Sequence, residues 1–239
     1  MDPKVSVIIR AKNEGRFLEQ VLLALKNQTY QNFEVIVGDD HSTDKTREVA
    51  EKYNCRIITI PDGKFTYPFA SNFTAAHARG KYLAFISGHS IPILKNWLEM
   101  GLKNFSDQKV AGVYSAVLAN PESNLFEKSA YLVSYLIKKW RLEHSKIKQV
   151  KMGVLGATNA IIRRDLWEKH PFDEQFAYGG EDRAWAKYWV ERGYKVIRDP
   201  YFRVYHSHNL GPTELLRQLF SWRLMGKPKQ FQAQKNNLK

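Results

Sequence analysis

Strand-like and helix-like segments alternate over the first 90 residues, and this alternation limits the possible folds more than any other feature of the chain. Residues 5–10 are mostly β-branched and apolar, which is typical of a strand that is covered on both faces. Further strands are predicted at 34–37, 56–60 and 82–86, and helices at 15–27, 42–53 (with Ser42 as N-cap) and 71–79. Such alternation predicts an α/β fold with a mostly parallel sheet flanked by helices.

The pattern becomes less regular after residue 92. We expect a short helix at 97–105, a long amphipathic helix at 125–142 and a helix at 181–192 that Gly193 ends, with strands at 110–117, 160–162 and 195–198. The long helix has two interpretations. Its apolar face (Leu132, Val133, Leu136, Ile137 and Trp140) packs on the sheet, or its aromatic and basic residues meet a membrane interface.

The formal net charge of +13 indicates an anionic partner. Residues 138–151 and 214–239 hold most of the excess, while the rest of the chain is nearly balanced. The basic residues are not interleaved in a nucleic-acid recognition motif, so we predict no nucleic-acid partner. The single cysteine, Cys55, excludes an intramolecular disulfide. Without a signal peptide pattern or a long apolar run, the expected location is cytoplasmic.

Carboxylates follow the second predicted strand, where a parallel sheet binds its ligands. Asp39 and Asp40 are adjacent there, and Asp44 follows. Such carboxylates accept hydrogen bonds from a nucleobase or a ribose. Alternatively, Asp40 and Asp44 only cap the next turn and helix. No GxGxxG and no Walker A loop is present, which argues against a dinucleotide site of the Rossmann type.

Histidines form a second candidate site. His89 follows the fourth predicted strand, where an imidazole is able to bind a divalent metal, although a lone histidine there is more often structural. Tyr205-His206-Ser207-His208 favours the metal, because His-x-His on an extended segment puts both rings on one side. Either His206 or His208 then completes a site with His89.

A pair of acidic residues opens the helix predicted at 181–192. Glu181 and Asp182 come directly after Gly179 and Gly180. One interpretation is that they only stabilise the helix dipole. The other is that one of them is a general base beside a substrate cleft.

Together these residues resemble the family 2 glycosyltransferases of the GT-A fold over about residues 5–225. Asn13-Glu14 is similar to that family's opening turn, Asp39-Asp40-His41-Ser42-Thr43-Asp44 to its DDGSTD signature and Glu181-Asp182 to its ED motif. Ser71-Asn72 through Ala78-Arg79-Gly80-Lys81-Tyr82 resembles a further family segment. Ser87-Gly88-His89 stands where the family normally has Asp-x-Asp, and this departure resembles the rhamnosyltransferase-like branch.

The resemblance implies a role for each matching residue. Asp182 takes a proton from the acceptor hydroxyl, and Glu181 orients the acceptor or the base. His89 with His206 or His208 holds Mn²⁺ or Mg²⁺ at the diphosphate. Arg217 and Arg223 either reach the diphosphate as well or are only surface charge. The nucleotide site comprises Ala11, Asn13, Glu14, Asp39, Asp40, Asn72, Ser87 and Gly88, and the acceptor side comprises Gly156, Ala157 and Asn159.

The expected function is inverting transfer of a sugar from a UDP- or dTDP-sugar to a hydroxyl of a glycan or polyprenyl-linked acceptor, in cell-surface polysaccharide synthesis. The alternative is a non-catalytic sugar-nucleotide-binding protein of the same fold. We expect a single domain over residues 1–225, with a nucleotide-binding half at 1–92, an acceptor-binding half at 93–225 and a basic tail at 226–239. The basic segments suggest peripheral contact with the anionic inner face of the plasma membrane.

Overall fold

The computed structural model describes residues 2–115, 117–129, 132, 148–149, 155–177, 179–208, 211 and 213–214. Most of the basic segments at 138–151 and 214–239, together with Arg217 and Arg223, lie outside the described residues. Only the first part of the predicted 125–142 helix is described, and residues 125–129 are helical.

The first half of the chain forms parallel strands connected by helices. The strands are β1 (Val5–Ala11), β2 (Phe33–Asp39), β3 (Arg56–Thr59) and β4 (Tyr82–Ser87), in the spatial order β3-β2-β1-β4. The helices are α1 (Gly15–Lys26), α2 (Thr46–Lys52) and α3 (Tyr67–Ala75). Each neighbouring pair of these strands is parallel, so the α/β prediction is confirmed.

The second half extends the same sheet. Its elements are α4 (Trp97–Leu102), the 3₁₀ helix η1 (Lys103–Ser106), β6 (Val110–Tyr114), β8 (Lys148–Gln149), β9 (Asn159–Arg163), α6 (Arg164–Lys169), α7 (Glu181–Val190) and β10 (Lys195–Arg198). Within the described residues the sheet order is β3-β2-β1-β4-β9-β6-β10-β8. Strand β9 runs antiparallel to both β4 and β6, so the sheet is mixed in its centre.

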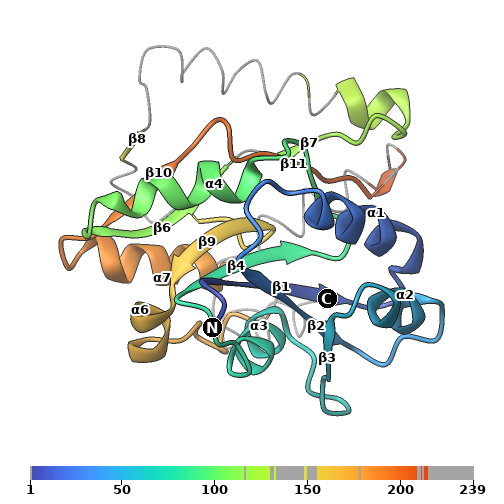
Figure 1. The fold of residues 1–239 in the computed structure, drawn as a ribbon, viewed down its shortest axis with the longest axis horizontal. Helices are drawn as coiled ribbons and strands as arrows, with labels where there is room; N and C mark the ends of the chain where they lie inside the picture. Colours follow the sequence, from blue (N-terminus) through green and yellow to red (C-terminus); the bar gives the residue numbers. More distant parts are fainter. Residues whose placement is uncertain are drawn as a thin grey trace, which may run out of the picture.

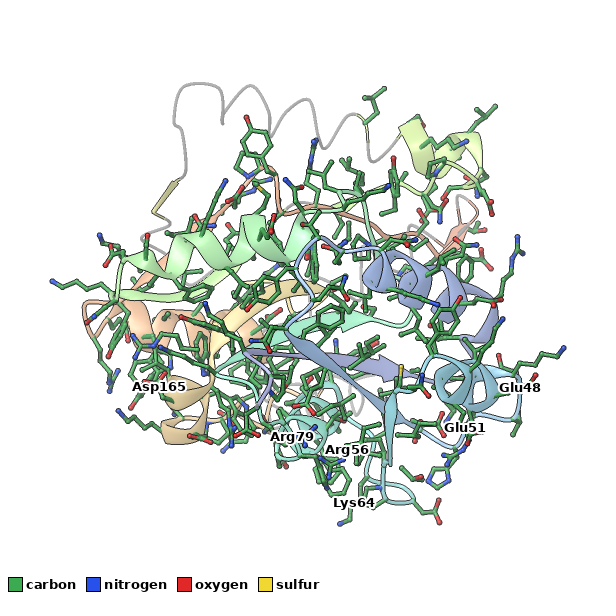
Figure 2. All side chains as sticks on the ribbon, in the orientation of Figure 1. Glu48, Glu51, Arg56, Lys64, Arg79 and Asp165 are labelled. Carbon is green, nitrogen blue, oxygen red and sulfur yellow. The ribbon has the colours of Figure 1, made fainter. Side chains whose placement is uncertain are left out.

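Helices cover both faces of this sheet (Figure 1). On one face α1, α2 and α4 pack against β1 through a core that includes Leu18, Val49 and Trp97. On the other face α3, α6 and α7 form a second core that includes Ala75, Trp167 and Trp185. Charged side chains such as those of Glu48, Glu51 and Lys64 lie at the outer surface (Figure 2). Burial on both faces explains why β1 is an unbroken apolar run from Val7 to Ile9.

A small second sheet lies beyond the carboxyl end of β4. It contains β5 (Ile91–Pro92), β11 (Val204–Tyr205) and β7 (Val117–Leu118) in the order β5-β11-β7. Strand β11 pairs with β5 in antiparallel orientation, with Val204 opposite Pro92. This pairing joins two segments that are more than a hundred residues apart in the sequence.

Two helix starts differ from the prediction. Helix α2 begins at Thr46, and Asp44 rather than Ser42 accepts a hydrogen bond from the backbone N–H of Thr46 (2.9 Å). Helix α3 begins at Tyr67, four residues before the predicted start, because Thr66 caps Phe69 N–H and Pro68 occupies the first turn. Helix α6 was not predicted.

The 125–142 segment also departs from the packed interpretation at one described position. Leu132 belongs to the predicted apolar face, yet 55% of its surface is exposed, and Leu125 is 84% exposed. The other residues of that face lie outside the described residues. In the part of the chain that the structure describes, no helix has both the length and the apolar character needed to cross a bilayer.

Candidate functional site

A cavity of about 360 Å³ opens at the carboxyl ends of β1 and β4. Arg10 and Ser87 line it from these two strands, and Glu181 and Asp182 line it from the first turn of α7. The three histidines named in the sequence analysis also line it: His89, His206 and His208. The structure therefore gathers the predicted base and the predicted metal ligands around one space.

The small sheet brings the three histidines together. His89 lies two residues before β5 and His206 directly follows β11, so the β5–β11 pairing places them side by side. The ring centres of His89 lie 4.5 Å from His206 and 4.8 Å from His208. Ring nitrogens of all three lie within 4.8 Å of one another, which is a suitable arrangement for a metal ion.

Hydrogen bonds orient two of these rings. Glu14 Oε1 lies 2.7 Å from Nδ1 of His89, and Ser90 Oγ lies 3.1 Å from Nδ1 of His206. Glu14 therefore supports a histidine, in the way that carboxylates commonly orient metal-binding imidazoles. Gly88 makes room for this contact, because a Cβ there would lie 3.0 Å from Cγ of Glu14.

The outer nitrogens of the cluster fit a cation. Nε2 of His89 is buried and has no hydrogen-bond partner in the part of the chain that the structure describes, and Nε2 of His206 faces Nε2 of His208 at 3.2 Å. Burial, together with the neighbouring His89 and His208, lowers the pKa of His206 well below its usual value, and burial also lowers the pKa of His208. Both imidazoles are then neutral near pH 7, the form that binds metals.

The carboxyl groups of α7 occupy contrasting environments. Asp182 Oδ2 accepts a hydrogen bond from Ala157 N–H (2.8 Å), and its Oδ1 accepts one from Arg183 N–H (2.7 Å). Glu181 is only 3% exposed, and its Oε2 has no hydrogen-bond partner among the described residues. Burial and the neighbouring Asp182 raise the pKa of Glu181 to about 7, and burial raises the pKa of Asp182. Raised carboxyl pKa values in a cavity are typical of acid–base catalysis.

Two consecutive glycines lead into this pair. Gly179 and Gly180 both have a φ of +104°, a left-handed conformation that side-chain-bearing residues rarely adopt. Gly180 is the N-cap of α7, so this backbone geometry sets the position at which Glu181 and Asp182 enter the cavity.

The 39–44 loop and the 11–14 turn form one hydrogen-bonded unit beside the cavity. Asn13 N–H donates to Ser42 Oγ (2.9 Å), and Asn13 Oδ1 accepts from Thr43 N–H (2.8 Å). Asp40 N–H donates to the carbonyl of Ala11, which is itself buried (3.0 Å). His41 has a φ of +54°, which explains why glycine is usual at this position of the motif that it resembles.

The two aspartates of this loop are paired with basic residues. Arg47 lies 2.9 Å from Asp39 Oδ2, and Lys12 Nζ lies 2.7 Å from Asp40 Oδ2. The side chain of Asp39 is fully buried, and its contacts are with Arg47 and with the backbone N–H of Ser42 in the loop. The contact of Asp39 with a nucleobase that the family resemblance implies stays a prediction.

A match to a protein-family model shows the family to which the chain belongs. The model described as glycosyl transferase family 2 matches residues 6–170, more than half of the chain. The chain belongs to glycosyl transferase family 2. The enzyme class predicted from the sequence, a glycosyltransferase, is thereby confirmed. The match ends before Glu181 and Asp182, so their placement depends on the structure.

Curated relatives of this glycosyltransferase match a larger part of the chain than the family model does. The O-antigen chain rhamnosyltransferase WbaN of Salmonella anatum is 27% identical over 91% of this chain and 70% of its own length. A GalNAc(5)-diNAcBac-PP-undecaprenol beta-1,3-glucosyltransferase of Campylobacter jejuni is 24% identical, over 85% of this chain and 64% of its own length. The first of these agrees with the predicted likeness to the rhamnosyltransferase-like branch.

Solved structures confirm the GT-A fold of this glycosyltransferase. The mannosyltransferase PcManGT from Pyrobaculum calidifontis, in complex with GDP-Man and Mn²⁺, aligns with a TM-score of 0.67 at 19% identity, over 86% of this chain and 57% of that one. S. aureus TarS in complex with UDP-GlcNAc aligns with a TM-score of 0.65 at 18% identity, over 87% and 59%. The chain thus spans less than two thirds of these structures.

Asn159 and Asn72 are two of the predicted site residues that do not line the cavity. Asn159 is 1% exposed; it accepts a hydrogen bond from Trp97 Nε1 (3.2 Å) and donates one to the Phe202 carbonyl (2.7 Å). Asn72 accepts from Trp167 Nε1 and donates to the Phe172 carbonyl. Both amides join core segments, because each carries a donor and an acceptor that tie two elements together. Their predicted contacts with acceptor and nucleotide stay predictions, whereas Gly156 and Ala157 do line the cavity.

The sequence analysis did not identify several polar residues of the cavity wall. They are Arg10, Tyr67, Thr158 and Arg183. Arg10 had a usable signal, because it is the one charged residue in the strand 5–11 and lies near that strand's carboxyl end. Tyr67 had none, because its part in the site depends on where α3 begins.

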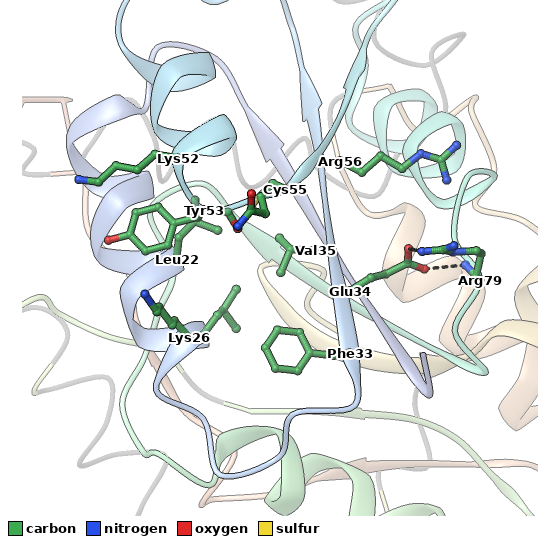
Figure 3. A pocket seen from close by; sticks show the side chains of 12 residues that line it. Leu22, Lys26, Phe33, Glu34, Val35, Lys52, Tyr53, Cys55, Arg56 and Arg79 are labelled. Carbon is green, nitrogen blue, oxygen red and sulfur yellow. Dashed lines mark hydrogen bonds and ion pairs between the residues drawn. The ribbon is translucent and has the colours of Figure 1, made fainter. Parts of the chain in front are cut away.

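A different cavity, of about 560 Å³, lies beside the beginning of β2 (Figure 3). Its lining includes Leu22, Phe33 and Tyr53, and the Glu34–Arg79 ion pair lies at its side. It contains none of the predicted site residues and lies at the amino end of β2. Parallel sheets of this type bind ligands at the other end, so cavity size does not identify the functional site here.

Proposed function

We propose that this chain is an inverting glycosyltransferase that moves a sugar from a nucleoside diphosphate sugar, with UDP or dTDP as the nucleotide, to a hydroxyl of a glycan or lipid-linked acceptor. The proposal rests above all on one observation: Glu181, Asp182 and the three histidines line the same cavity at the carboxyl ends of the strands. The printed functions of the O-antigen rhamnosyltransferase and the undecaprenol-linked glucosyltransferase support a role in cell-surface polysaccharide synthesis.

In the proposed reaction, Asp182 is the general base. The acceptor hydroxyl attacks the anomeric carbon from the side opposite the leaving group, and its proton passes to Asp182. The bond between the anomeric carbon and the phosphate oxygen breaks, and the nucleoside diphosphate leaves with the electron pair. The two backbone N–H groups that bind Asp182 hold its carboxylate in position for this transfer.

His89, His206 and His208 would hold a divalent cation, Mn²⁺ or Mg²⁺. Such an ion would neutralise the charge that grows on the leaving diphosphate. Glu14 orients His89 for this purpose, and Ser90 orients His206. The 39–44 loop and the 11–14 turn form the proposed nucleotide site, with Asp40, Lys12 and Arg47 as its charged groups.

Replacing the proposed base tests the catalytic proposal. Asp182→Asn should reduce transfer by about 10²–10⁴-fold, the usual contribution of general base catalysis, and leave nucleotide affinity nearly unchanged in calorimetry. Asp107→Asn is the matched control, because Asp107 pairs with Lys195 before β6, away from the cavity. Full turnover by Asp182→Asn would refute the base. Nucleotide-sugar binding without transfer or donor hydrolysis in the wild type would favour the non-catalytic alternative.

Calorimetry of UDP with and without Mn²⁺ tests the metal. We expect Mn²⁺ to tighten UDP binding in the wild type and not in His89→Ala. Equal affinity in all four measurements would remove the metal role of His89.

We further propose that the region around residues 125–132 touches an anionic membrane. Leu125, Phe126 and Leu132 are exposed by 84%, 45% and 55%, and the sequence run 138–151 that follows is strongly basic. Liposome flotation should show salt-sensitive binding to anionic vesicles that Leu125→Ser/Phe126→Ser weakens. Absence of salt-sensitive binding in the wild type would refute membrane contact.

A further inference from the structure

Arg10 occupies a special position in the sheet. It lies one residue before the end of β1, opposite Gly38 on β2 and Ser87 on β4. Side chains alternate along a strand, so Arg10 points to the same face as Ile8, which packs in the core against α3, α6 and α7. Its side chain therefore lies on the same face of the sheet as α7, and it lines the cavity together with the two carboxyl groups of that helix.

Tyr67 holds the guanidinium in this position. Arg10 NH1 donates a hydrogen bond to the Tyr67 carbonyl (3.3 Å), and the guanidinium carbon lies 5.2 Å from the centre of the Tyr67 ring. Among the described residues, no carboxylate lies within ion-pair distance of Arg10. Most of its five N–H donors are thus left for the cavity, and its charge is not cancelled by a direct partner.

The charge of Arg10 acts on both acidic residues of α7. Burial raises the pKa of Glu181 and of Asp182, and the positive charge of Arg10 opposes this effect at each carboxyl group. Among the described residues, the other titratable or charged groups on the cavity wall are Tyr67, Arg183 and the three histidines. Arg183 also favours the ionised form of Asp182.

We propose that Arg10 is a positioning residue for the catalytic carboxyl groups, which favours the ionised, proton-accepting form of Glu181 and Asp182. This inference rests on the proposed role of Asp182 as general base. Arg10 acts through the field of its charge, and Tyr67 fixes the distance over which that field acts. Arg10 lies in the first strand, far in the sequence from α7. The proposed nucleotide-binding half of the chain thus influences proton transfer in the proposed acceptor-binding half.

The test compares Arg10→Gln, Arg10→Lys and the control Arg16→Gln over a range of pH. Arg16 also stacks on an aromatic ring, that of Phe17, but it lies on α1 and does not line the cavity. For Arg10→Gln, we expect kcat/KM at pH 6 to fall roughly tenfold further than at pH 8.5, because the acid limb moves to higher pH by about one pH unit. Arg10→Lys and Arg16→Gln should keep the acid limb of the wild type.

A second measurement reads the carboxyl groups without any substrate. Carbon NMR of protein labelled at the Glu and Asp carboxyl groups follows their titration, and the signals of Glu181 and Asp182 are assigned with Glu181→Gln and Asp182→Asn. We expect both to titrate at higher pH in Arg10→Gln than in the wild type. This result would support the inference about Arg10 even if the wild type transferred no sugar, in which case only the proposed function would fail.

Three results would overturn the inference. Unchanged carboxyl titration in folded Arg10→Gln would do so. So would a loss of kcat/KM that is equal at all pH values, because that indicates direct substrate contact. An Arg10→Lys protein that shifts as far as Arg10→Gln would show that the charge is not the cause.

Discussion

The buried carboxyl group of Glu181 should make the stability of the fold depend on pH in an unusual direction. Glu181 is 3% exposed, and its Oε2 has no hydrogen-bond partner within the residues that the structure describes. Burial and the adjacent Asp182 raise its pKa from the ordinary 4.5 to about 7. The folded protein therefore binds this proton more tightly than the unfolded chain does, so ionisation of Glu181 opposes folding.

The size of the effect follows from the two pKa values. Below pH 4.5 the group is protonated in both states, and its contribution to stability is fully present. As the pH rises to about 7, only the unfolded chain loses the proton, and the free energy of unfolding falls. The total loss above that pH is about 3 kcal/mol, at 1.36 kcal/mol for each pH unit between the two values. The raised pKa of Asp182 adds a loss of the same sign.

The assay is urea unfolding of the wild type and Glu181→Gln at several pH values between 4.5 and 8.5. Glutamine has nearly the same shape and does not ionise, so the variant should gain stability relative to the wild type as the pH rises, by about 3 kcal/mol in all. The difference in unfolding free energy between the two proteins at low pH measures the cost of replacing the carboxyl group by an amide. Subtracting this difference leaves the effect of ionisation. Parallel stability curves for the two proteins would refute the reasoning.

A control of opposite sign is available in Glu34. Burial tends to raise its pKa, but hydrogen bonds from Ser6 and Arg79 lower it overall. Ionisation of Glu34 therefore stabilises the fold above its unfolded pKa, and this contribution disappears as the pH falls through the folded value. Glu34→Gln should lose stability relative to the wild type at neutral pH and approach it in acid.

Two further predictions concern packing and metal binding. Gly38→Ala would place a Cβ 2.1 Å from Thr74 Oγ1, so the free energy of unfolding in urea should fall by about 1–3 kcal/mol. Adding Thr74→Ala to the same chain should restore most of this stability. A double variant that is no more stable than Gly38→Ala would contradict the steric explanation. Glu14→Gln removes the carboxylate that orients His89, so direct calorimetry should show about 10–100-fold weaker Mn²⁺ binding; unchanged affinity would mean that Glu14 does not support a metal ligand.

Several features of the fold could be predicted from local patterns. The buried strands 5–10 and 82–86 are apolar runs, and α1 has apolar residues at helical spacing, because local periodicity reflects which faces are covered. The antiparallel insertion of β9 between β4 and β6 could not be predicted. Strand order depends on pairing between distant segments, and a short apolar run such as 160–162 contains no information about its neighbours.

The same division applies to the candidate site. The sequence by itself determined the chemical types that meet there: imidazoles at His89, His206 and His208, and carboxyl groups at Glu181 and Asp182. Only the tertiary structure decided which of them share a cavity, because the β5–β11 pairing and the left-handed glycines before α7 set those positions. It also placed Asn72 and Asn159 in hydrogen bonds outside the cavity lining and Arg10 on the cavity wall. Whether a polar side chain serves the core or the cavity depends on the elements packed around it, and these come from distant parts of the chain.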